Sequence, residues 1–343
     1  MNKRAFRADL LLLLTAVIWG LGFVAQHAGM RYIGPFGYSA LRFLLGALFL
    51  LPFALLYNRR KLRGELNDEK PKNRKAFIVS SFLAGSYIFL AVSLQSLGMI
   101  FTTVGNAGFI TGLYVIFTPI FGIFLHRKTG SATWVGAFLT LTGLFFLSFA
   151  GGHGSINPGD ILLAGGAVFW AFHVLCIDRL VKKTCPIALS AGQFLFAGLF
   201  SAIAAFIIEP FFSPWLQSLE PGLLGAGLYS WIPFPALISG LAFGGIPFSL
   251  VSNAVVPVLY GGIVAGGIAY TFQLAAQRDA PPAHVTIILC LEGSFAALGG
   301  VFILGERVGG WTMLGFALML GGMLTSQRGV LAGRRAEEKY EKH

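Results

Sequence analysis

Long apolar segments alternate with short charged ones along most of the chain. Ten of these segments reach about 18 residues or more, the length that the hydrocarbon core of a bilayer requires of a helix. They lie at 9–28, 35–57, 76–97, 101–125, 132–150, 160–181, 187–208, 254–277, 283–303 and 310–328. The pattern predicts an all-α membrane protein with ten transmembrane helices.

The positions of the basic residues predict the direction of insertion. With a cytoplasmic N-terminus, 22 of the 25 Lys and Arg residues fall in cytoplasmic segments; the outer loops hold only Arg31 and Arg307, and Arg42 lies within a span. Cytoplasmic loops of membrane proteins carry an excess of Lys and Arg. We therefore expect a multi-pass protein of the plasma membrane (the inner membrane in a Gram-negative bacterium) with both termini in the cytoplasm. The first segment also resembles a signal peptide, but its recurrence later in the chain argues against that alternative.

One apolar stretch occurs twice. SALRFLLGALF (39–49) and SAGQFLFAGLF (190–200) lie 151 positions apart and match at Ser, Ala, Phe, Leu, Leu and Phe. Asp9 and Asp160 pair at the same offset. Two copies of five spans each, an odd number, must insert in opposite directions. An inverted repeat with a central cavity is the architecture of many alternating-access transporters.

The repeats predict two five-helix domains, at 9–150 and 158–328. The offset grows to 179 near the C-terminus, so the second copy has gained 28 residues, which fall at about 209–253. This insertion is rich in Pro and Gly and contains no Lys or Arg. We expect it to form an outer interfacial segment or lid, with a re-entrant hairpin as the alternative.

The composition agrees with a membrane protein and excludes several other classes. The chain is 56% hydrophobic and only 11% charged, whereas ordinary globular domains are roughly 25% charged. The net charge of +11 comes from short basic clusters between apolar runs rather than from a basic face with interleaved aromatic residues, so nucleic-acid binding is disfavoured. The three cysteines show no CxxC spacing, which disfavours a disulfide framework or a zinc site.

Charged residues within the spans are the first candidates for function, because they are costly in hydrocarbon and tend to face a cavity or one another. Arg42 lies seven residues after Pro35, roughly 10 Å below the outer face at about 1.5 Å per residue. It could hold a substrate carboxylate, pair with Glu292, or extend to the lipid headgroups. Glu292 lies deep in the ninth span, where it could carry a proton, neutralise Arg42 or an amine substrate, or lock two helices in a structural ion pair.

Other polar side chains fall on helical stripes. His173 could change charge in the working pH range or simply donate a hydrogen bond to a neighbour. The stripes could equally serve hydrogen bonding between helices, but several of them are predicted to surround one cavity. The candidate substrate-binding residues are Trp19, Arg42, Tyr87, Gln95, Asn106, Trp170, His173, Gln193, Tyr270, Gln273 and Glu292. The GFITG (108–112) and GIVAG (262–266) motifs predict close helix packing.

Several longer motifs lie in different predicted spans. They are AVIWGLGFV in the first span, ALRF in the second, TTVGNAGFITGLYVIFTPIFG in the fourth, IAYTFQLAAQ in the eighth, and LEGSFAALGGVFILGE from the ninth toward the tenth. Together they resemble the EamA-like family of the drug/metabolite transporter superfamily, over nearly the whole chain except 209–253. The resemblance implies a ten-helix basket with a central cavity and export of amino acids, amines or similar metabolites. Arg127 stands where the family often has a glutamate after the fourth span, although Glu306 retains it in the second half.

We therefore expect a secondary transporter that exports small metabolites by alternating access, with proton coupling left open. An uncoupled facilitator or channel is the alternative. A membrane-embedded enzyme is disfavoured because the sequence has no HExxH or GxSxG motif, and the lack of a Walker A motif disfavours ATP hydrolysis. The expected partners are a small-molecule substrate and membrane lipid; protons and a second copy of the chain, as a homodimer, are left open. No nucleic acid, cofactor or metal is expected.

Overall fold

A computed structural model describes residues 3–63, 74–102, 104–127, 129–149, 158–212, 248–304 and 310–340. Within these ranges the elements are helical and no strand occurs. In chain order they are α1 (Lys3–Ile33), α2 (Pro35–Leu62), α3 (Arg74–Gly98), α4 (Val104–Thr111), α5 (Tyr114–Phe124), α6 (Ser131–Phe149), α7 (Pro158–Leu180), α8 (Pro186–Ile207), α11 (Phe248–Leu259), η1 (Tyr260–Ala269), α12 (Tyr270–Ala276), α13 (Pro282–Leu289), α14 (Leu291–Leu304) and α15 (Gly310–Tyr340). η1 is a π-helix that joins α11 directly to α12.

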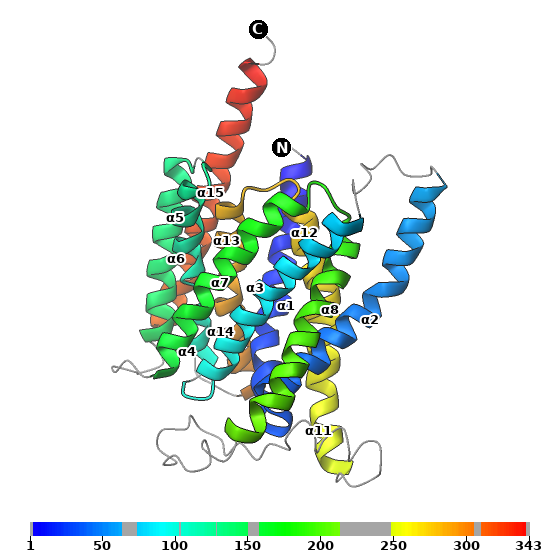
Figure 1. Ribbon diagram of the computed structural model, residues 1–343. Helices are drawn as coiled ribbons and strands as arrows, with labels where there is room; N and C mark the ends of the chain where they lie inside the picture. Colours follow the sequence, from blue (N-terminus) through cyan, green and yellow to red (C-terminus); the bar gives the residue numbers. More distant parts are fainter. Residues whose placement is uncertain are drawn as a thin grey trace.

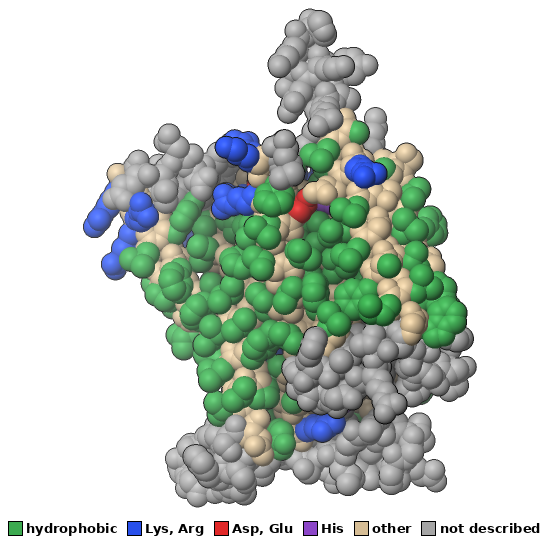
Figure 2. Space-filling model, turned by 180° about the vertical axis from the view of Figure 1, so that it is seen from behind, with side chains coloured by type: hydrophobic (Ala, Val, Ile, Leu, Met, Phe, Trp, Pro, Cys, Tyr) green, Lys and Arg blue, Asp and Glu red, His purple; other side chains and the backbone are tan. Residues whose placement is uncertain are grey.

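Seven helical stretches of the described chain are long and apolar enough to cross a membrane. Five of them are α1, α2, α3, α7 and α8, and the other two are the combined stretches Ala107–Phe124 and Asn253–Ala276. Ser131–Phe146 and Pro282–Ala296 are shorter apolar helices in the places of two further predicted spans, and the last predicted span falls within α15. Figure 2 shows apolar side chains in a broad band over the bundle, with Lys and Arg toward its ends. These lengths and compositions are those of a multi-pass membrane protein.

Two of the predicted spans are interrupted near their middle rather than continuous. The fourth divides into α4 and α5 at Gly112 and Leu113, and the ninth divides into α13 and α14 at Cys290. The two breaks lie against each other, since the Cys290 thiol donates a hydrogen bond to the carbonyl oxygen of Gly112 at 3.3 Å. Discontinuous helices of this kind are common at the substrate sites of membrane transporters. Hydropathy alone gives no sign of these breaks, because both sides of each are equally apolar.

A tight turn joins α1 to α2 at one end of the bundle. Gly34 has a φ of +80°, in the left-handed region that favours glycine, and Pro35 opens α2. The fully buried carboxylate of Glu209, just after α8, accepts the backbone N–H groups of Phe36 and Gly37 at 2.7 and 2.8 Å. A buried carboxylate is well placed there because the N-terminus of a helix has unpaired N–H groups and a partial positive charge.

Glu209, the first residue of the predicted insertion, is buried against α2, and its carboxylate caps that helix. At the far side of the insertion α11 already begins at Phe248, so the helix is longer than the predicted span from residue 254. The rest of the expected lid, 213–247, lies outside the described residues.

At the other end of the bundle, Figure 1 shows the start of α1, and α15 projects beyond the bundle at this same end. Asp9 joins three helices there. Its Oδ1 lies 3.0 Å from Nε2 of His284 on α13, and its Oδ2 accepts a hydrogen bond from the Gln327 side chain on α15 at 2.7 Å. Nearby, Asp178 on α7 forms ion pairs with Arg127, which follows α5, and with Lys182. Both clusters join helices from the first and second halves of the sequence.

Helices approach closely where glycines face them. A Cβ atom on Gly112 would lie 2.6 Å from Leu144, and one on Gly262 would lie 2.8 Å from the carbonyl oxygen of Arg42. The close packing predicted for the 108–112 and 262–266 motifs is therefore confirmed. The Gly262 contact brings η1 against α2, which places Arg42 beside the centre of the bundle.

Candidate functional site

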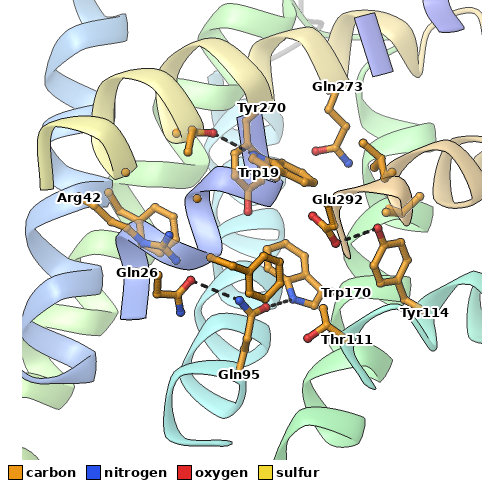
Figure 3. Close-up of a pocket in the computed structure, with 18 residues that line it drawn as sticks. Trp19, Gln26, Arg42, Gln95, Thr111, Tyr114, Trp170, Tyr270, Gln273 and Glu292 are labelled. Carbon is orange, nitrogen blue, oxygen red and sulfur yellow. Dashed lines mark hydrogen bonds between the residues drawn. The ribbon is translucent and has the colours of Figure 1, made fainter. Parts of the chain in front are cut away.

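A small cavity lies in the middle of the bundle, where α1, α2, α3, α7, η1, α12 and the two interrupted helices meet (Figure 3). Its volume is about 60 Å³, which is room for a few water molecules, since one water needs roughly 10–15 Å³ on the same measure. Seven of the eleven predicted binding residues line it: Trp19, Arg42, Gln95, Trp170, Tyr270, Gln273 and Glu292. The sequence therefore predicted most of the polar lining of this central pocket.

Three aromatic rings form one wall of the central pocket. The ring centroid of Tyr270 lies 4.6 Å from that of Trp19 and 6.3 Å from that of Trp170. Each indole is fixed by a hydrogen bond: Trp19 donates to the carbonyl oxygen of Ala265 at 3.0 Å, and Trp170 donates to Oε1 of Gln95 at 2.9 Å. The rings are thus held in fixed orientations, and aromatic faces of this kind attract cations.

Glu292 brings a carboxylate to the central pocket. It is 4% exposed and lies in the first turn of α14, directly after the break at Cys290. The break puts the positive end of the α14 dipole beside the carboxylate, an arrangement that stabilises negative charge. The hydroxyl of Tyr114, just after the break between α4 and α5, donates a hydrogen bond to Oε1 of Glu292 at 3.2 Å. The two interrupted helices therefore supply both partners.

Arg42 reaches the same pocket from the other side. Its guanidinium carbon lies 5.3 Å from the ring centroid of Tyr38 and 4.6 Å from that of Phe43, so two rings hold it. The expected alternative of an ion pair between Arg42 and Glu292 is wrong: no such pair forms, and Figure 3 shows the two side chains at opposite sides of the pocket. Arg42 is only 9% exposed, which also contradicts the alternative that it reaches the lipid headgroups. Its Nε has no hydrogen-bond partner.

Glutamine amides complete the lining. Gln95 donates to Oε1 of Gln26 at 3.3 Å, and Gln26 donates to the hydroxyl of Ser96 at 2.9 Å. On the other side, Gln273 donates to Gln277 at 3.0 Å and keeps one buried amide oxygen without a partner. A buried polar atom without a partner is costly, so the oxygen of Gln273 offers an acceptor to a ligand.

The fold and the family are both recognised by comparison with known proteins. The model of the EamA-like transporter family matches residues 6–149 and 230–326, well over half of the chain. The chain belongs to the EamA-like transporter family. One crystal structure matches this transporter with a TM-score of 0.68 at 18% identity and covers 96% of this chain and 98% of the other, a likeness that concerns the fold alone.

Several relatives of this EamA-like protein carry transporter names. An uncharacterized transporter of Archaeoglobus fulgidus is 28% identical over 306 residues, which cover 89% of this chain and 80% of the relative. The uncharacterized transporter YvbV of Bacillus subtilis is 28% identical, with 68% and 75% covered. The uncharacterized inner membrane transporter YedA of Escherichia coli is 29% identical over 195 residues, which cover 56% of this chain and 59% of YedA. The protein is thus a transporter rather than an enzyme.

Four of the eleven predicted binding residues are not among the residues that line the central pocket. His173 and Gln193 form a buried pair, with Nε2 and Oε1 3.1 Å apart, just outside the lining. Tyr87 turns away and stacks on Phe172, with ring centroids 6.0 Å apart. The side chain of Asn106 lies outside the described part of the chain. His173, Gln193 and Tyr87 each contact a polar partner or an aromatic neighbour outside the cavity. The spacing of polar residues along one helix cannot indicate such partners on other parts of the chain.

Tyr114, Thr111 and Gln26 line the central pocket but were missing from the predicted binding residues. Gln26 follows Trp19 by seven residues, two turns of one helix, so its position carried a signal. Thr111 and Tyr114 flank the break between α4 and α5. They are three residues apart, and Tyr114 follows Asn106 by eight, spacings that share a helix face, so periodicity carried a signal for them as well. Among the described residues, no group of three His, Cys, Asp or Glu side chains is arranged to hold a metal ion.

Proposed function

We propose that this transporter carries small amines or zwitterions, such as amino acids, through the central pocket and exports them across the plasma membrane by alternating access. The observation that carries the proposal is the placement of Glu292 and Arg42 on opposite sides of one aromatic-lined pocket (Figure 3). Buried charges normally pair with each other or with a ligand. Because these two do not pair, both are available to a substrate.

The pocket suits the two ends of an amino acid. An ammonium group would lie between the carboxylate of Glu292 and the faces of Trp19 and Tyr270, where ring and carboxylate both favour positive charge. A carboxylate would lie against the guanidinium of Arg42, whose donors match a carboxylate in geometry. An amine without a carboxylate would use only the first of these contacts. The pocket therefore favours zwitterions over simple amines when Arg42 is present.

Two inverted repeats of five spans each would place this pocket between the halves. The sequence match at an offset of 151 supports such a duplication, and so do the contacts. The end of α1, at Gly34, lies beside Glu209 at the end of α8, whereas the start of α1, at Asp9, lies by His284 at the start of α13. Gly159 at the start of α7 packs on Gly98 at the end of α3. These contacts fit α1 and α7 running in opposite directions, as the repeat requires.

The ends of the bundle support alternating access. Clusters around Asp9 and Asp178 join the two halves at one end, and Glu209 joins them at the other. The pocket between them is too small for an amino acid in this arrangement, so one end must open before a substrate enters. The excess of Lys and Arg at the end that holds both termini supports a cytoplasmic location for that end.

Proton coupling is the finer part of the proposal and rests on Glu292. A buried carboxylate needs either a proton or a counter-charge. Tyr114 supplies a hydrogen bond but no charge. We infer that Glu292 holds a proton when the pocket has no ammonium group and releases it when one binds, which exchanges protons for substrate.

The test is transport in proteoliposomes, with a panel of labelled amino acids and amines, with and without a pH gradient. We expect saturable uptake that the gradient stimulates. Arg42→Gln should lose the preference for amino acids over the matching amines, and Glu292→Gln should lose the stimulation by the gradient. Both variants must elute from size-exclusion chromatography like the parent protein.

The results separate the alternatives. Gradient dependence that is unchanged in Glu292→Gln would remove this residue from coupling. Uptake that follows only the substrate gradient in the parent protein would favour an uncoupled facilitator. An unchanged substrate preference in Arg42→Gln would contradict the zwitterion site.

A further inference from the structure

A second, larger cavity opens on the side of the bundle. It lies between α2 and α8, extends to the start of α3, and has a volume of about 840 Å³, within the range of roughly 300–1,000 Å³ that is typical of ligand sites. It shares no lining residue with the central pocket. Substrate binding in the central pocket therefore does not account for this α2–α8 groove.

The groove exists because α2 and α8 touch at one level and separate at another. Near the middle of the bundle they are in close contact: a Cβ atom on Gly198 would lie 2.8 Å from Leu44. Farther along, Pro52 interrupts the hydrogen-bond ladder of α2, and Figure 1 shows the end of α2 leaning away from α8. Small side chains keep the space between them open: Ala47, Ala54, Ala188, Ala191 and Gly192.

The lining changes from apolar to polar along the groove. Leu48, Leu51 and Leu195 line its deeper part, and Asn58 and Arg74 line the part near the end of the bundle. From Leu44 to Asn58 the groove follows α2 over fourteen residue-to-residue steps, or roughly 21 Å at about 1.5 Å per step. One leaflet of the hydrocarbon core is about 15 Å deep. The groove is therefore long enough for an acyl chain, with its polar part at headgroup level.

The polar end of the groove is strongly basic. Five basic side chains are described at this end of α2 and at the start of α3: Arg59, Arg60, Arg63, Arg74 and Lys75. Arg59 and Lys75 are exposed at this end, on α2 and α3. Clusters of four to eight basic residues beside a membrane span attract anionic lipids, and basic pockets between spans bind anionic headgroups.

We propose that the α2–α8 groove binds an anionic phospholipid, with one acyl chain along Leu48 and Leu51 and its phosphate at Arg74. The apolar part alone would accept the chain of any lipid. The basic end selects a headgroup with net negative charge, because the amine of a zwitterionic lipid would meet a surplus of positive charge. The proposal concerns the side of the bundle and does not depend on which substrate the transporter carries.

Native mass spectrometry of the full chain, released from detergent in the presence of phosphatidylglycerol or phosphatidylcholine, tests the proposal directly. We expect one phosphatidylglycerol to remain bound in preference to phosphatidylcholine. Arg74→Gln should lower this preference about fivefold, the effect of one basic residue at an anionic surface. Arg328→Gln is the matched control, because Arg328 lies on α15, away from the groove.

A second pair of variants tests the apolar part. Ala54→Leu with Ala188→Leu fills the groove from both walls and should remove bound lipid of either kind. Ala317→Leu, at an exposed alanine of α15, is the control for added apolar volume and should leave binding unchanged.

Three outcomes would overturn the proposal. One is equal retention of the two lipids by the parent protein. Another is bound phosphatidylglycerol that survives the double leucine variant in a protein that still elutes as folded. The third is a dimer that the double variant dissociates, which would assign the groove to a second copy of the chain.

Discussion

Trp19 and Trp170 lie 151 residues apart in the sequence, one in each half of the chain, and their ring centroids lie 6.3 Å apart in the central pocket. Tyr270 contacts both rings. Each half of the molecule thus contributes one indole to the same aromatic wall. A movement of one half against the other would separate these rings and change the wall.

Trp19→Ala and Trp170→Ala should each raise the KM for an amine or amino acid by about tenfold. The reason is the loss of a desolvated cation–π contact, worth up to about 2 kcal/mol. Transport kinetics in proteoliposomes measure the change. Trp311→Ala serves as the control, because Trp311 is 53% exposed on α15 and stacks on Phe146. A KM that stays the same in both pocket variants would mean that the rings are only structural.

Tyr114→Phe should weaken substrate binding by about tenfold or more, since a hydrogen bond to a charged group contributes roughly 1.5–3 kcal/mol and Tyr114 donates one to Glu292. The affinity is measured by competition with a labelled substrate. Tyr87→Phe removes the same hydroxyl from a tyrosine that stacks on Phe172 outside the pocket and should have no effect. Equal losses in the two variants would count against a role for Tyr114.

Glu209→Ala should lower the free energy of unfolding by about 1–3 kcal/mol for each N–H group left without a buried acceptor. Those groups belong to Phe36 and Gly37. Thermal unfolding can be followed in detergent with a thiol-reactive dye in a background where the partly exposed Cys176 and Cys185 are replaced by serine. Cys290 is 1% exposed and then reacts only after unfolding. Glu209→Gln keeps one acceptor oxygen and should recover part of the loss. An unchanged melting temperature in Glu209→Ala would show that another group caps α2.

The sequence predicted an all-helical membrane protein correctly, for a simple physical reason, and seven of its stretches are helices long and apolar enough to cross a membrane. In a bilayer the backbone must satisfy its own hydrogen bonds, so an apolar run of sufficient length becomes a helix. Side chains on one helix also keep their spacing, which is why Trp19, Tyr270 and Gln273 were correctly placed on the central pocket. Arg42 and Glu292 were predicted there as well.

Distances and contacts between side chains on different helices could not be predicted from the sequence. The polar stripes gave no measure of distance across the pocket. The sequence therefore could not decide whether Arg42 and Glu292 form an ion pair, and the structure places them on opposite sides of the pocket. His173 and Gln193 are twenty residues apart on two consecutive helices, α7 and α8, and one hydrogen bond joins Nε2 of the first to Oε1 of the second. Tyr114 follows Asn106 by eight residues and so shares its helix face, but nothing in the sequence indicated that its hydroxyl would meet Glu292 on another helix.

The contact between α1 and α14 gives the sharpest test of packing at the site. A Cβ atom on Gly20 would lie 2.6 Å from Phe295 and 2.7 Å from the carbonyl oxygen of Glu292, closer than real Cβ contacts. Gly20→Ala must therefore push α14 away and displace the carboxylate. Overpacking of this kind typically costs about 1–3 kcal/mol, so we expect a lower melting temperature together with a lower transport rate.

Gly22→Ala makes the matched comparison. Gly22 lies on the same helix and also lines the central pocket, but its Cβ would meet only Ala265, at an ordinary distance of 3.7 Å. Alanine also favours a helix over glycine by about 1 kcal/mol, so this variant should be as stable as the parent or more so. Melting temperatures of the two variants decide the matter. If Gly20→Ala unfolds at or above the temperature of Gly22→Ala, then α1 and α14 are not in contact at Glu292, and the carboxylate does not hold the position in the pocket on which the proposed amine recognition depends.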